Sequence, residues 1–333
     1  MKAVTLIGPG EVHLTDIPEP NPSPGDLLLR VERVGLCGTD LNSYRGKNPL
    51  VTYPRIIGHE IAATVLEGSS AVPAGTRVTV SPYTHCGQCA ACRRGRVNAC
   101  RFNQTLGVQR DGAMTELLAV SEAKVYPSSL SLKELCLVEP LTVGVHAVSR
   151  ARVTPQDTVA VYGCGGVGLG AIAGSAFCGA QTIAIDVDEE KLETAQAAGA
   201  THLINSRKDS VDERLQQITN GFGPDVIIEA IGLPETFRNA VEQVAFTGRV
   251  VYIGYAKEPV SYETRLFVQK ELDILGSRNA LPEDFRKVIS ILESGSFPVD
   301  RAVSAIVPMA DAPAALERWS QDPASFTKIM VSI

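Results

Sequence analysis

Four of the chain's eight cysteines lie close together, at a spacing that suits a metal ion. Cys86, Cys89, Cys92 and Cys100 follow the pattern C-x2-C-x2-C-x7-C. Four thiolates at such short spacing can surround one Zn²⁺ tetrahedrally, as in a closed structural site. In a reducing compartment this grouping favours metal over disulfides. We therefore predict a structural zinc lobe over about residues 85–101; the alternative is four free cysteines in a loop.

A glycine-rich segment, residues 163–168 (GCGGVG), has the residue types that bring a backbone close to a phosphate. The pattern G-x-G-x-x-G follows a strand-like run and opens a helix of small residues, the context that supports a dinucleotide site. Glycines there permit a tight turn and close approach of a pyrophosphate to the helix N-terminus. A glycine-rich structural turn is the alternative. The predicted cofactor-binding residues in this segment are Gly163, Gly165, Gly166, Val167 and Gly168.

Asp186 ends the next strand-like run, residues 181–186. It lies roughly 20 residues beyond the glycines, where a carboxylate binds the ribose 2′-hydroxyl of a dinucleotide. Residues 187–190 (VDEE) contain no Arg or Lys to bind a 2′-phosphate. The sequence therefore predicts NAD rather than NADP as the cofactor.

Cys37, His59, Glu60 and Glu139 together supply one thiolate, one imidazole and two carboxylates. This is the ligand mix of a catalytic zinc with an open position. Taken singly, each residue also has an ordinary structural interpretation: a small core cysteine, a satisfied core histidine, or a glutamate that ends a helix before proline.

His59 and Glu60 are adjacent within an otherwise apolar segment, residues 53–67 (YPRIIGHEIAATVLE). Burying an ionised carboxylate without a partner is costly. Successive strand residues point to opposite faces, so a regular strand cannot aim both side chains at one metal. Gly58 immediately precedes them, and we expect it to allow a local distortion of the strand.

The first 148 residues, which carry most of these side chains, have short apolar runs punctuated by glycine and proline. This pattern is typical of a β-rich domain of barrel type. The predicted strands lie at 27–34, 55–67 and 75–82.

Residues 149–275 change to an alternation of strands and helices, which indicates βαβ units and a parallel sheet. Within them, residues 159–185 carry no charge and are long enough to span a bilayer, but their seven glycines and the following Asp186 favour a strand–helix–strand unit. Residues 276–333, with a helix and a final strand, are predicted to return to the first domain. The predicted strands are 158–163, 181–186, 201–205, 225–232, 249–254 and 271–277.

The net charge and the N-terminal sequence indicate which kinds of partner and which location to expect for this protein. The net charge is −6 at pH 7 and no basic block occurs, so a nucleic-acid partner, including the zinc-ribbon type, is disfavoured. The N-terminus lacks the apolar core of a signal peptide. We expect a soluble, cytoplasmic protein with no membrane association.

The motifs "GLCGTD" (35–40) and "GHE" (58–60), the four-cysteine lobe and the glycine pattern occur in this order along the chain. In this combination the sequence resembles the zinc-dependent medium-chain dehydrogenase/reductase family over essentially its whole length. The resemblance implies a GroES-like β-barrel catalytic domain, a Rossmann domain and an active site in the cleft between them. It also implies that Cys37 and His59 are catalytic zinc ligands, with Glu60 as the third.

The same resemblance implies roles for further residues. Asp40 would orient His59, and Thr39 would contact the substrate oxygen. Lys191 would bind the adenosine ribose and Lys328 the pyrophosphate.

Glu139 stands where the alcohol dehydrogenases of the family have a third ligand cysteine, which resembles the polyol dehydrogenase branch. Glu60 and Glu139 both remain candidates for the zinc ligand, and they can exchange during turnover. Asn42 replaces a histidine that passes the substrate proton to solvent in the alcohol dehydrogenases, and it cannot titrate. A zinc-bound water with one of the two glutamates is therefore the expected proton acceptor.

Within that branch, the segments "YPRIIGHE", "GVQRDGAMTEL" and "LGSRNALPEDF" resemble bacterial sugar-acid dehydrogenases. Arg278 falls where polyol dehydrogenases keep a substrate-binding arginine, and a guanidinium fork suits a carboxylate or a row of hydroxyls. A salt bridge at the domain junction is its alternative role. Tyr44 is the other predicted substrate residue.

These observations predict an NAD-dependent zinc dehydrogenase that oxidises a secondary hydroxyl of a sugar acid or polyol. A threonine or simple-alcohol dehydrogenase is the alternative within the family. An NAD-binding structural protein on the same fold is the alternative outside enzymes. The family resemblance also implies a homodimer or homotetramer.

Overall fold

The computed structural model describes residues 1–323 and 326–333, which divide into two compact units. The first unit comprises Met1–Glu139 and Val299–Ile333, and the second comprises Pro140–Pro298. The two divisions therefore fall at residues 140 and 299, where the sequence predicts 149 and 276. The first lies inside helix α3 (Leu132–Ala151), and the second follows helix α9 (Pro282–Glu293).

Helix α9 belongs to the second unit because it packs there on helix α4 and carries a buried polar contact to α3. Nδ1 of His146, in α3, lies 2.7 Å from Oδ2 of Asp284, in α9, and both side chains are buried. Sequence periodicity predicts the helix itself but not the unit on which it packs.

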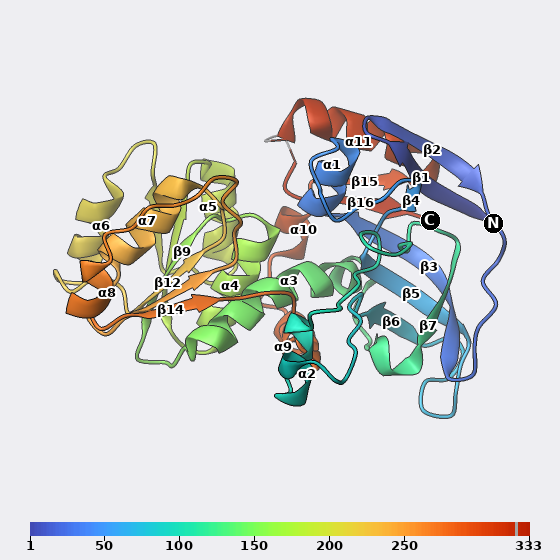
Figure 1. Ribbon diagram of the computed structural model, residues 1–333, viewed down its shortest axis with the longest axis horizontal. Helices are drawn as coiled ribbons and strands as arrows, with labels where there is room; N and C mark the ends of the chain where they lie inside the picture. The colour runs from blue at the N-terminus through green and yellow to red at the C-terminus, as the bar shows by residue number, and fades with distance from the viewer. Residues whose placement is uncertain (324–325) are drawn as a thin grey trace. The chain divides into compact units, whose positions relative to one another are not determined.

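The first unit is built on a seven-stranded sheet of order β15-β16-β3-β5-β6-β8, with β7 paired to β3, and on a three-stranded sheet of order β2-β1-β4 (Figure 1). The final strand, β16, pairs with β3, so residues 299–333 lie in the first unit, whereas the helix at 282–293, predicted to return with them, lies in the second. The strands are β1 (Lys2–Gly8), β2 (Glu11–Asp16), β3 (Asp26–Leu36), β4 (Arg55–Ile56), β5 (Glu60–Glu67), β6 (Arg77–Val80), β7 (Leu117–Ser121), β8 (Val125–Pro127), β15 (Ala305–Pro308) and β16 (Ile329–Ser332).

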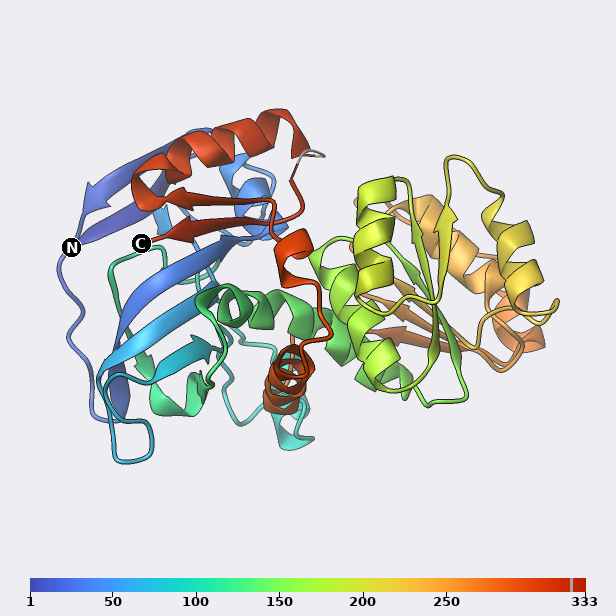
Figure 2. The ribbon, with the colours of Figure 1, turned by 180° about the vertical axis from the view of Figure 1, so that it is seen from behind.

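The strands of this unit are explained by side chains that alternate between buried and exposed positions. In β3, Leu27, Leu29 and Val31 are buried while Arg30 between them is exposed, the period expected when one face covers a core. Helix α11 (Ala312–Gln321) lies across β15 and β16 in Figure 2 and packs Leu316 into the same core. The short helices of the unit are α1 (Gly38–Tyr44), α2 (Ala90–Arg93), η1 (Val97–Ala99), η2 (Glu122–Lys124), α10 (Val299–Ala302) and η3 (Met309–Asp311).

The second unit has a six-stranded sheet of order β11-β10-β9-β12-β13-β14, and every pair in it is parallel. This is the doubly wound order of a Rossmann domain, so the predicted fold class is confirmed. The strands are β9 (Thr158–Tyr162), β10 (Gln181–Asp186), β11 (His202–Asn205), β12 (Val226–Glu229), β13 (Arg249–Tyr252) and β14 (Asp273–Gly276), and the remaining helices are α4 (Gly166–Phe177), α5 (Glu189–Ala197), α6 (Val211–Ile218), α7 (Pro234–Gln243) and α8 (Arg265–Gln269).

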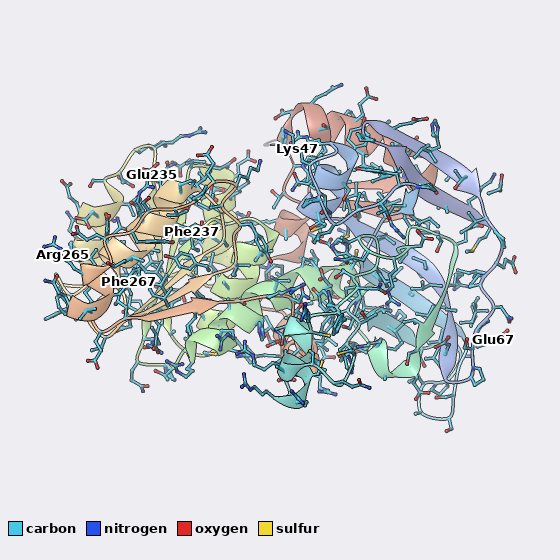
Figure 3. All side chains as sticks on the ribbon, viewed as in Figure 1. Lys47, Glu67, Glu235, Phe237, Arg265 and Phe267 are labelled. Atoms are coloured by element: carbon cyan, nitrogen blue, oxygen red, sulfur yellow. The ribbon has the colours of Figure 1, made fainter. Side chains whose placement is uncertain are left out.

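Helices cover both faces of this parallel sheet, as its almost uninterrupted apolar strands require. Helix α7 covers the face toward the viewer in Figure 1, and α5 the face toward the viewer in Figure 2. Phe237 of α7, labelled in Figure 3, stacks on Tyr252 of β13 with ring centroids 4.3 Å apart. The uncharged stretch 159–185 forms β9, α4 and β10, as predicted, and none of the described helices is long and apolar enough to cross a membrane.

Candidate active site

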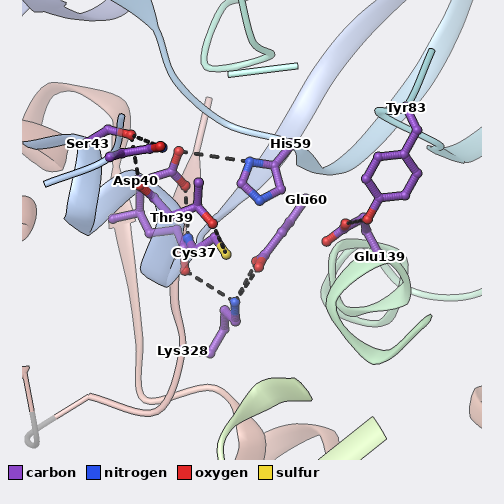
Figure 4. A network of polar contacts seen from close by, with 11 residues as sticks. Cys37, Thr39, Asp40, Ser43, His59, Glu60, Tyr83, Glu139 and Lys328 are labelled. Carbon is purple, nitrogen blue, oxygen red and sulfur yellow. Dashed lines mark hydrogen bonds and ion pairs between the residues drawn. The ribbon is translucent and has the colours of Figure 1, made fainter. Parts of the chain in front are cut away.

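The first unit brings Cys37, His59 and Glu60 together: their ligand atoms all lie within 4.8 Å of one another. Cys37 is the N-cap residue of α1, directly after β3, and Glu60 is the first residue of β5. Strands β3 and β5 pair with Gly35 opposite Glu60, which places the end of one strand beside the start of the other. Backbone pairing therefore assembles a thiol, an imidazole and a carboxylate from separate parts of the sequence (Figure 4).

The strand carrying His59 and Glu60 is interrupted between β4 and β5, as the sequence predicts. Gly58 has φ +98°, a conformation that a side chain would strain, and a Cβ there would lie 2.7 Å from Cγ1 of Val34. This break removes the strict alternation of faces, so that His59 and Glu60 both reach the cluster.

His59 faces Asp40 on the side away from Glu60. Nδ1 of His59 lies 3.9 Å from Oδ1 of Asp40, too far for a hydrogen bond, and both atoms are buried without a partner among the described residues. The other Asp40 oxygen accepts a hydrogen bond of 2.9 Å from the backbone amide of Cys37. Burial opposes the charged imidazole, but Asp40 and the Cys37 sulfur outweigh it and raise the pKa of His59 well above its usual value.

Glu60 is fully buried, and its charge is matched by Lys328. Nζ of Lys328 lies 2.5 Å and 2.7 Å from the two carboxylate oxygens and 3.2 Å from the carbonyl oxygen of Leu36. Burial disfavours the ammonium form, but Glu60 and the nearby Cys37 raise the pKa of Lys328 above its usual value. The family resemblance assigns Lys328 to the cofactor pyrophosphate, whereas the structure places its ammonium group on Glu60.

Gly35 leaves the space that the Glu60 carboxylate occupies. A Cβ built on Gly35 would lie 1.9 Å from Oε2 of Glu60, so no other residue fits opposite this glutamate without moving it. The packing of Glu60 therefore explains why position 35, the first residue of "GLCGTD", is a glycine, which the sequence motif alone does not reveal.

Glu139, in helix α3, presents its buried carboxylate beside the cluster, where it accepts a hydrogen bond from the hydroxyl of Tyr83 (Figure 4). Burial raises the pKa of Glu139 above its usual value, against the opposing effect of His59. Glu139 does not belong to the mutually close ligand group among the described residues, so its role as an alternative zinc ligand stays a prediction. Sequence reasoning missed Tyr83, because nothing in its local pattern distinguishes it from a core tyrosine.

The residues of the cluster fit a zinc ion. They supply a soft sulfur, an imidazole nitrogen and a carboxylate oxygen, which are the ligand types zinc takes in catalytic sites. The unpartnered Nδ1 of His59, aimed at Asp40, matches the usual arrangement in which a carboxylate orients a metal-binding imidazole.

The predicted structural lobe is also assembled, with Cys86, Cys89, Cys92 and Cys100 forming the second mutually close ligand group. Sulfur–sulfur distances are 3.5 Å for Cys89–Cys92, 3.9 Å for Cys89–Cys100 and 4.0 Å for Cys86–Cys92. Tetrahedral Zn–S bonds of about 2.3 Å place sulfurs about 3.8 Å apart. The lobe therefore fits one zinc ion.

The thiols of the lobe differ in their pKa values. Backbone amides, first that of Cys92, lower the pKa of the Cys89 thiol to about 6. Loss of solvent raises the pKa of the Cys92 thiol to about 11. Four thiolates therefore need a cation among them, and without one at least one sulfur keeps its proton.

The glycine-rich segment has the expected strand–turn–helix geometry in the second unit. Gly163 has φ +95°, and a Cβ on Gly168 would lie 1.8 Å from the Gly163 carbonyl oxygen. Gly165 is the N-cap of α4 and has open space where a Cβ would be, which leaves the helix N-terminus accessible to a phosphate.

Asp186 stands at the carboxyl end of β10, beside the glycine turn. Oδ2 accepts a hydrogen bond of 2.7 Å from the amide of Cys164, and Oδ1 accepts one of 2.7 Å from the amide of Val187. These bonds fix the carboxylate at the edge where dinucleotide ribose binds in this fold. Lys191 lies in the first turn of α5, whose N-cap is Asp188, and its contact with the adenosine ribose stays a prediction.

The remaining predicted residues divide between the units. Thr39 belongs to the cluster, with its hydroxyl 3.6 Å from the Cys37 sulfur. Tyr44 ends α1 and packs partly buried against the core of the first unit. Arg278 is an exposed residue of the second unit, just after β14, and the substrate contacts of Tyr44 and Arg278 stay predictions.

Comparison with known proteins agrees with this geometry. Residues 166–294 match the family model described as zinc-binding dehydrogenase, and residues 23–130 match the alcohol dehydrogenase GroES-like domain. The sorbitol dehydrogenase of Bacillus subtilis is 34% identical over 99% of this chain and 97% of its own length. The chain belongs to the zinc-binding dehydrogenase family.

Other members of the zinc-binding dehydrogenase family extend the comparison. The L-galactonate-5-dehydrogenase of Escherichia coli is 33% identical over 89% of each chain. Among solved structures, the NADH complex of rspB from Escherichia coli CFT073 has a TM-score of 0.91 at 28% identity, covering 100% of this chain and 99% of its own. A zinc-binding dehydrogenase from Sinorhizobium meliloti bound to NADP has a TM-score of 0.91 at 30% identity, with the same coverage.

Proposed function

We propose that this zinc-type dehydrogenase oxidises a secondary hydroxyl of a polyol or sugar acid to a ketone, with NAD as the hydride acceptor. The observation that carries the proposal is the buried pair of Glu139 and Tyr83 beside the ligand cluster. A second carboxylate with a fixed hydroxyl partner suits a substrate that presents several hydroxyls. Relatives named for sorbitol and for L-galactonate support this substrate class.

The chain's own residues have distinct roles in this proposal. Cys37, His59 and Glu60 would hold the zinc ion, which as a Lewis acid lowers the pKa of a substrate hydroxyl. Lys328 neutralises Glu60 and holds its carboxylate in one orientation. Thr39 places a hydroxyl beside the Cys37 sulfur. There it can donate a hydrogen bond to the substrate oxygen or accept one from it.

Glu139 is the residue suited to take up the substrate proton. Its raised pKa lets it hold a proton nearer neutral pH than an ordinary glutamate does, as a general base requires. Asn42 at the family's histidine position cannot take this role, because an amide does not titrate.

NAD is proposed over NADP because Asp186 presents a carboxylate where the extra phosphate of NADP would lie. Hydrogen bonds from the backbone amides of Cys164, Val187 and Asp188 hold this carboxylate in place, and it would repel the 2′-phosphate of NADP. We expect kcat/KM to be at least about tenfold higher with NAD than with NADP, and D186S to reduce this ratio. Equal use of both cofactors by the wild-type enzyme would overturn the proposal for NAD.

The substrate class is tested by measuring NADH formation with hexonates, hexitols and tetritols, L-threonine, and simple primary and secondary alcohols. We expect the highest kcat/KM among the polyols or sugar acids. Activity confined to L-threonine or to small alcohols contradicts the proposed class. Absence of turnover with any of them, in protein that binds two zinc ions per chain, favours the non-enzymatic alternative.

Self-association is the remaining part of the proposal, because the family resemblance implies a homodimer or homotetramer. Light scattering after size exclusion gives the mass directly, and a monomer of 35.5 kDa would contradict it.

A further inference from the structure

A cavity of about 320 Å³ lies in the first unit and contains none of the residues assigned above. Its volume is at the lower end of the roughly 300–1,000 Å³ typical of small-molecule sites. The polar residues that line it are Asp26, Thr84, His85, Arg110, Ser121 and Lys124.

Three basic side chains converge on this cavity from different elements. Lys124 ends the turn η2, Arg110 lies in the loop before β7, and His85 precedes the cysteine lobe. Nζ of Lys124 lies 3.3 Å from Nδ1 of His85. Backbone hydrogen bonds hold two of these segments in place: the carbonyl of Lys124 accepts from Ser81, and that of Arg110 accepts from Gly107.

Within the described ranges neither Arg110 nor Lys124 forms an ion pair with a carboxylate, and the partner of the Lys124 ammonium is the His85 ring nitrogen. Nε of Arg110 is buried without a hydrogen-bond partner, and its guanidinium forms no ion pair with any residue the structure describes. No carboxylate within the described ranges lies within 4.0 Å of the Lys124 ammonium, although Asp26 lines the same cavity. The Asp26 carboxylate instead accepts a hydrogen bond of 3.2 Å from the amide of Ser23.

The charges of Arg110 and Lys124 act on each other in the cavity. Burial, and then Arg110, lower the pKa of Lys124, and burial lowers the pKa of Arg110. Both lowered pKa values mean that the cavity destabilises the protonated, charged forms of Lys124 and Arg110. An anion in the cavity would remove this penalty by pairing with both groups.

We propose that this cavity is a binding site for a small phosphate-type oxyanion, either free phosphate or the phosphate group of a monoester. The Arg110 guanidinium would supply a planar pair of donors and Lys124 a point charge, the combination that recognises phosphate. Thr84 and Ser121 place hydroxyls on the same wall. Because His85 directly precedes Cys86, an occupied site adjoins the zinc lobe.

The experiment is calorimetric titration of the zinc-loaded protein with inorganic phosphate, at constant ionic strength and with saturating NADH so that the pyrophosphate site is filled. The variants are R110Q, R110K and K124Q. The matched control is K208Q, which removes the same charge from an exposed lysine of the second unit that is paired with Glu189. Zinc content and NADH binding verify that each variant is folded.

We expect wild-type protein and K208Q to bind phosphate alike. The affinity for phosphate should fall at least about tenfold in R110Q and K124Q. It should fall less in R110K, which keeps the positive charge but loses the paired donors of the guanidinium group. A parallel titration with a hexose 6-phosphate distinguishes the source: tighter binding than phosphate identifies a monoester ligand, and equal binding identifies free phosphate. No binding to wild-type protein at millimolar phosphate, or equal affinity in wild type, R110Q and K124Q, overturns the proposal.

Discussion

Nζ of Lys328 lies within 2.7 Å of both carboxylate oxygens of Glu60, and both side chains are buried. The pair joins β5 to the residue before β16, which are far apart in sequence. A buried ion pair of this kind is costly to break, because removing one partner leaves the other charge unmatched. The relationship makes Glu60 a carboxylate with one fixed orientation beside Cys37 and His59.

Replacement of Lys328 tests that positioning role. In K328M the Glu60 carboxylate loses its counter-charge, and we expect kcat to fall by about 10- to 100-fold, the usual effect of losing a group that orients a metal ligand. K328R should retain most activity. The measurement is kcat together with KM for NAD: a rise in KM alone would support the pyrophosphate role and contradict the positioning role.

Gly35 offers a test from the opposite side of the same carboxylate. In G35A the new Cβ would approach Oε2 of Glu60 to 1.9 Å, and Glu60 cannot swing aside without losing Lys328. We expect reduced zinc affinity at the active site and a loss of stability of about 1–3 kcal/mol. Gly8 is the control, since a Cβ there meets nothing within 4 Å. Equal activity of G35A and G8A would show that the carboxylate tolerates displacement.

Tyr83 is expected to hold Glu139 in its working orientation. Y83F removes only the hydroxyl that donates to Glu139, so we expect kcat/KM for the polyol or sugar-acid substrate to fall by about tenfold. The zinc content should not change. Y252F is a suitable control, because it removes a tyrosine hydroxyl that bonds the Phe237 carbonyl in the second unit. Unchanged kinetics in Y83F would separate Tyr83 from the reaction.

The two metal groups should be separable by mutation. H59A should lose one zinc ion per chain and all turnover, because it removes a ligand from the Cys37–His59–Glu60 group only. The zinc ion of the four-cysteine lobe should remain bound. C89S should lose the other zinc ion and lower the thermal stability, since metal binding in such lobes is coupled to folding. C178S, outside both groups, is the control. Loss of both ions in either variant would indicate that the sites depend on each other.

The Asp157–Arg249 pair predicts a pH dependence of stability in the second unit. Burial by itself raises the pKa of Asp157, but the Thr154 amide and the Arg249 guanidinium outweigh it and leave the pKa below its usual value. The stabilisation is therefore complete above the unfolded pKa of about 3.9 and is lost as pH falls through the lower folded pKa.

We accordingly expect D157N to be destabilised by about 2–4 kcal/mol at pH 7, with the difference from wild type shrinking below about pH 4. Urea unfolding at several pH values measures it. D16N removes an exposed carboxylate paired with Lys2 and should have a much smaller effect. A D157N deficit that stays constant down to pH 3 would mean that charge is not its cause.

Much of this protein is determined by local sequence. The spacing of Cys86, Cys89, Cys92 and Cys100 predicts their grouping, because a short chain segment brings its own ligands together. The glycines at 163–168 predict their turn for the same reason, because Gly163 has φ +95° and a Cβ on Gly168 would lie 1.8 Å from the Gly163 carbonyl oxygen. Alternation of strand and helix likewise predicts the parallel sheet.

Only the tertiary structure decided what surrounds Glu60 and Glu139. The sequence left both as candidate ligands, and it contains no local signal that Lys328 neutralises the first or that Tyr83 bonds the second. The assignment of α9 to the second unit depends in the same way on the distant His146–Asp284 contact. Such contacts arise when strand pairing and helix packing bring remote segments together. The sequence around a residue does not specify which distant side chains will bury it or pair with its charge.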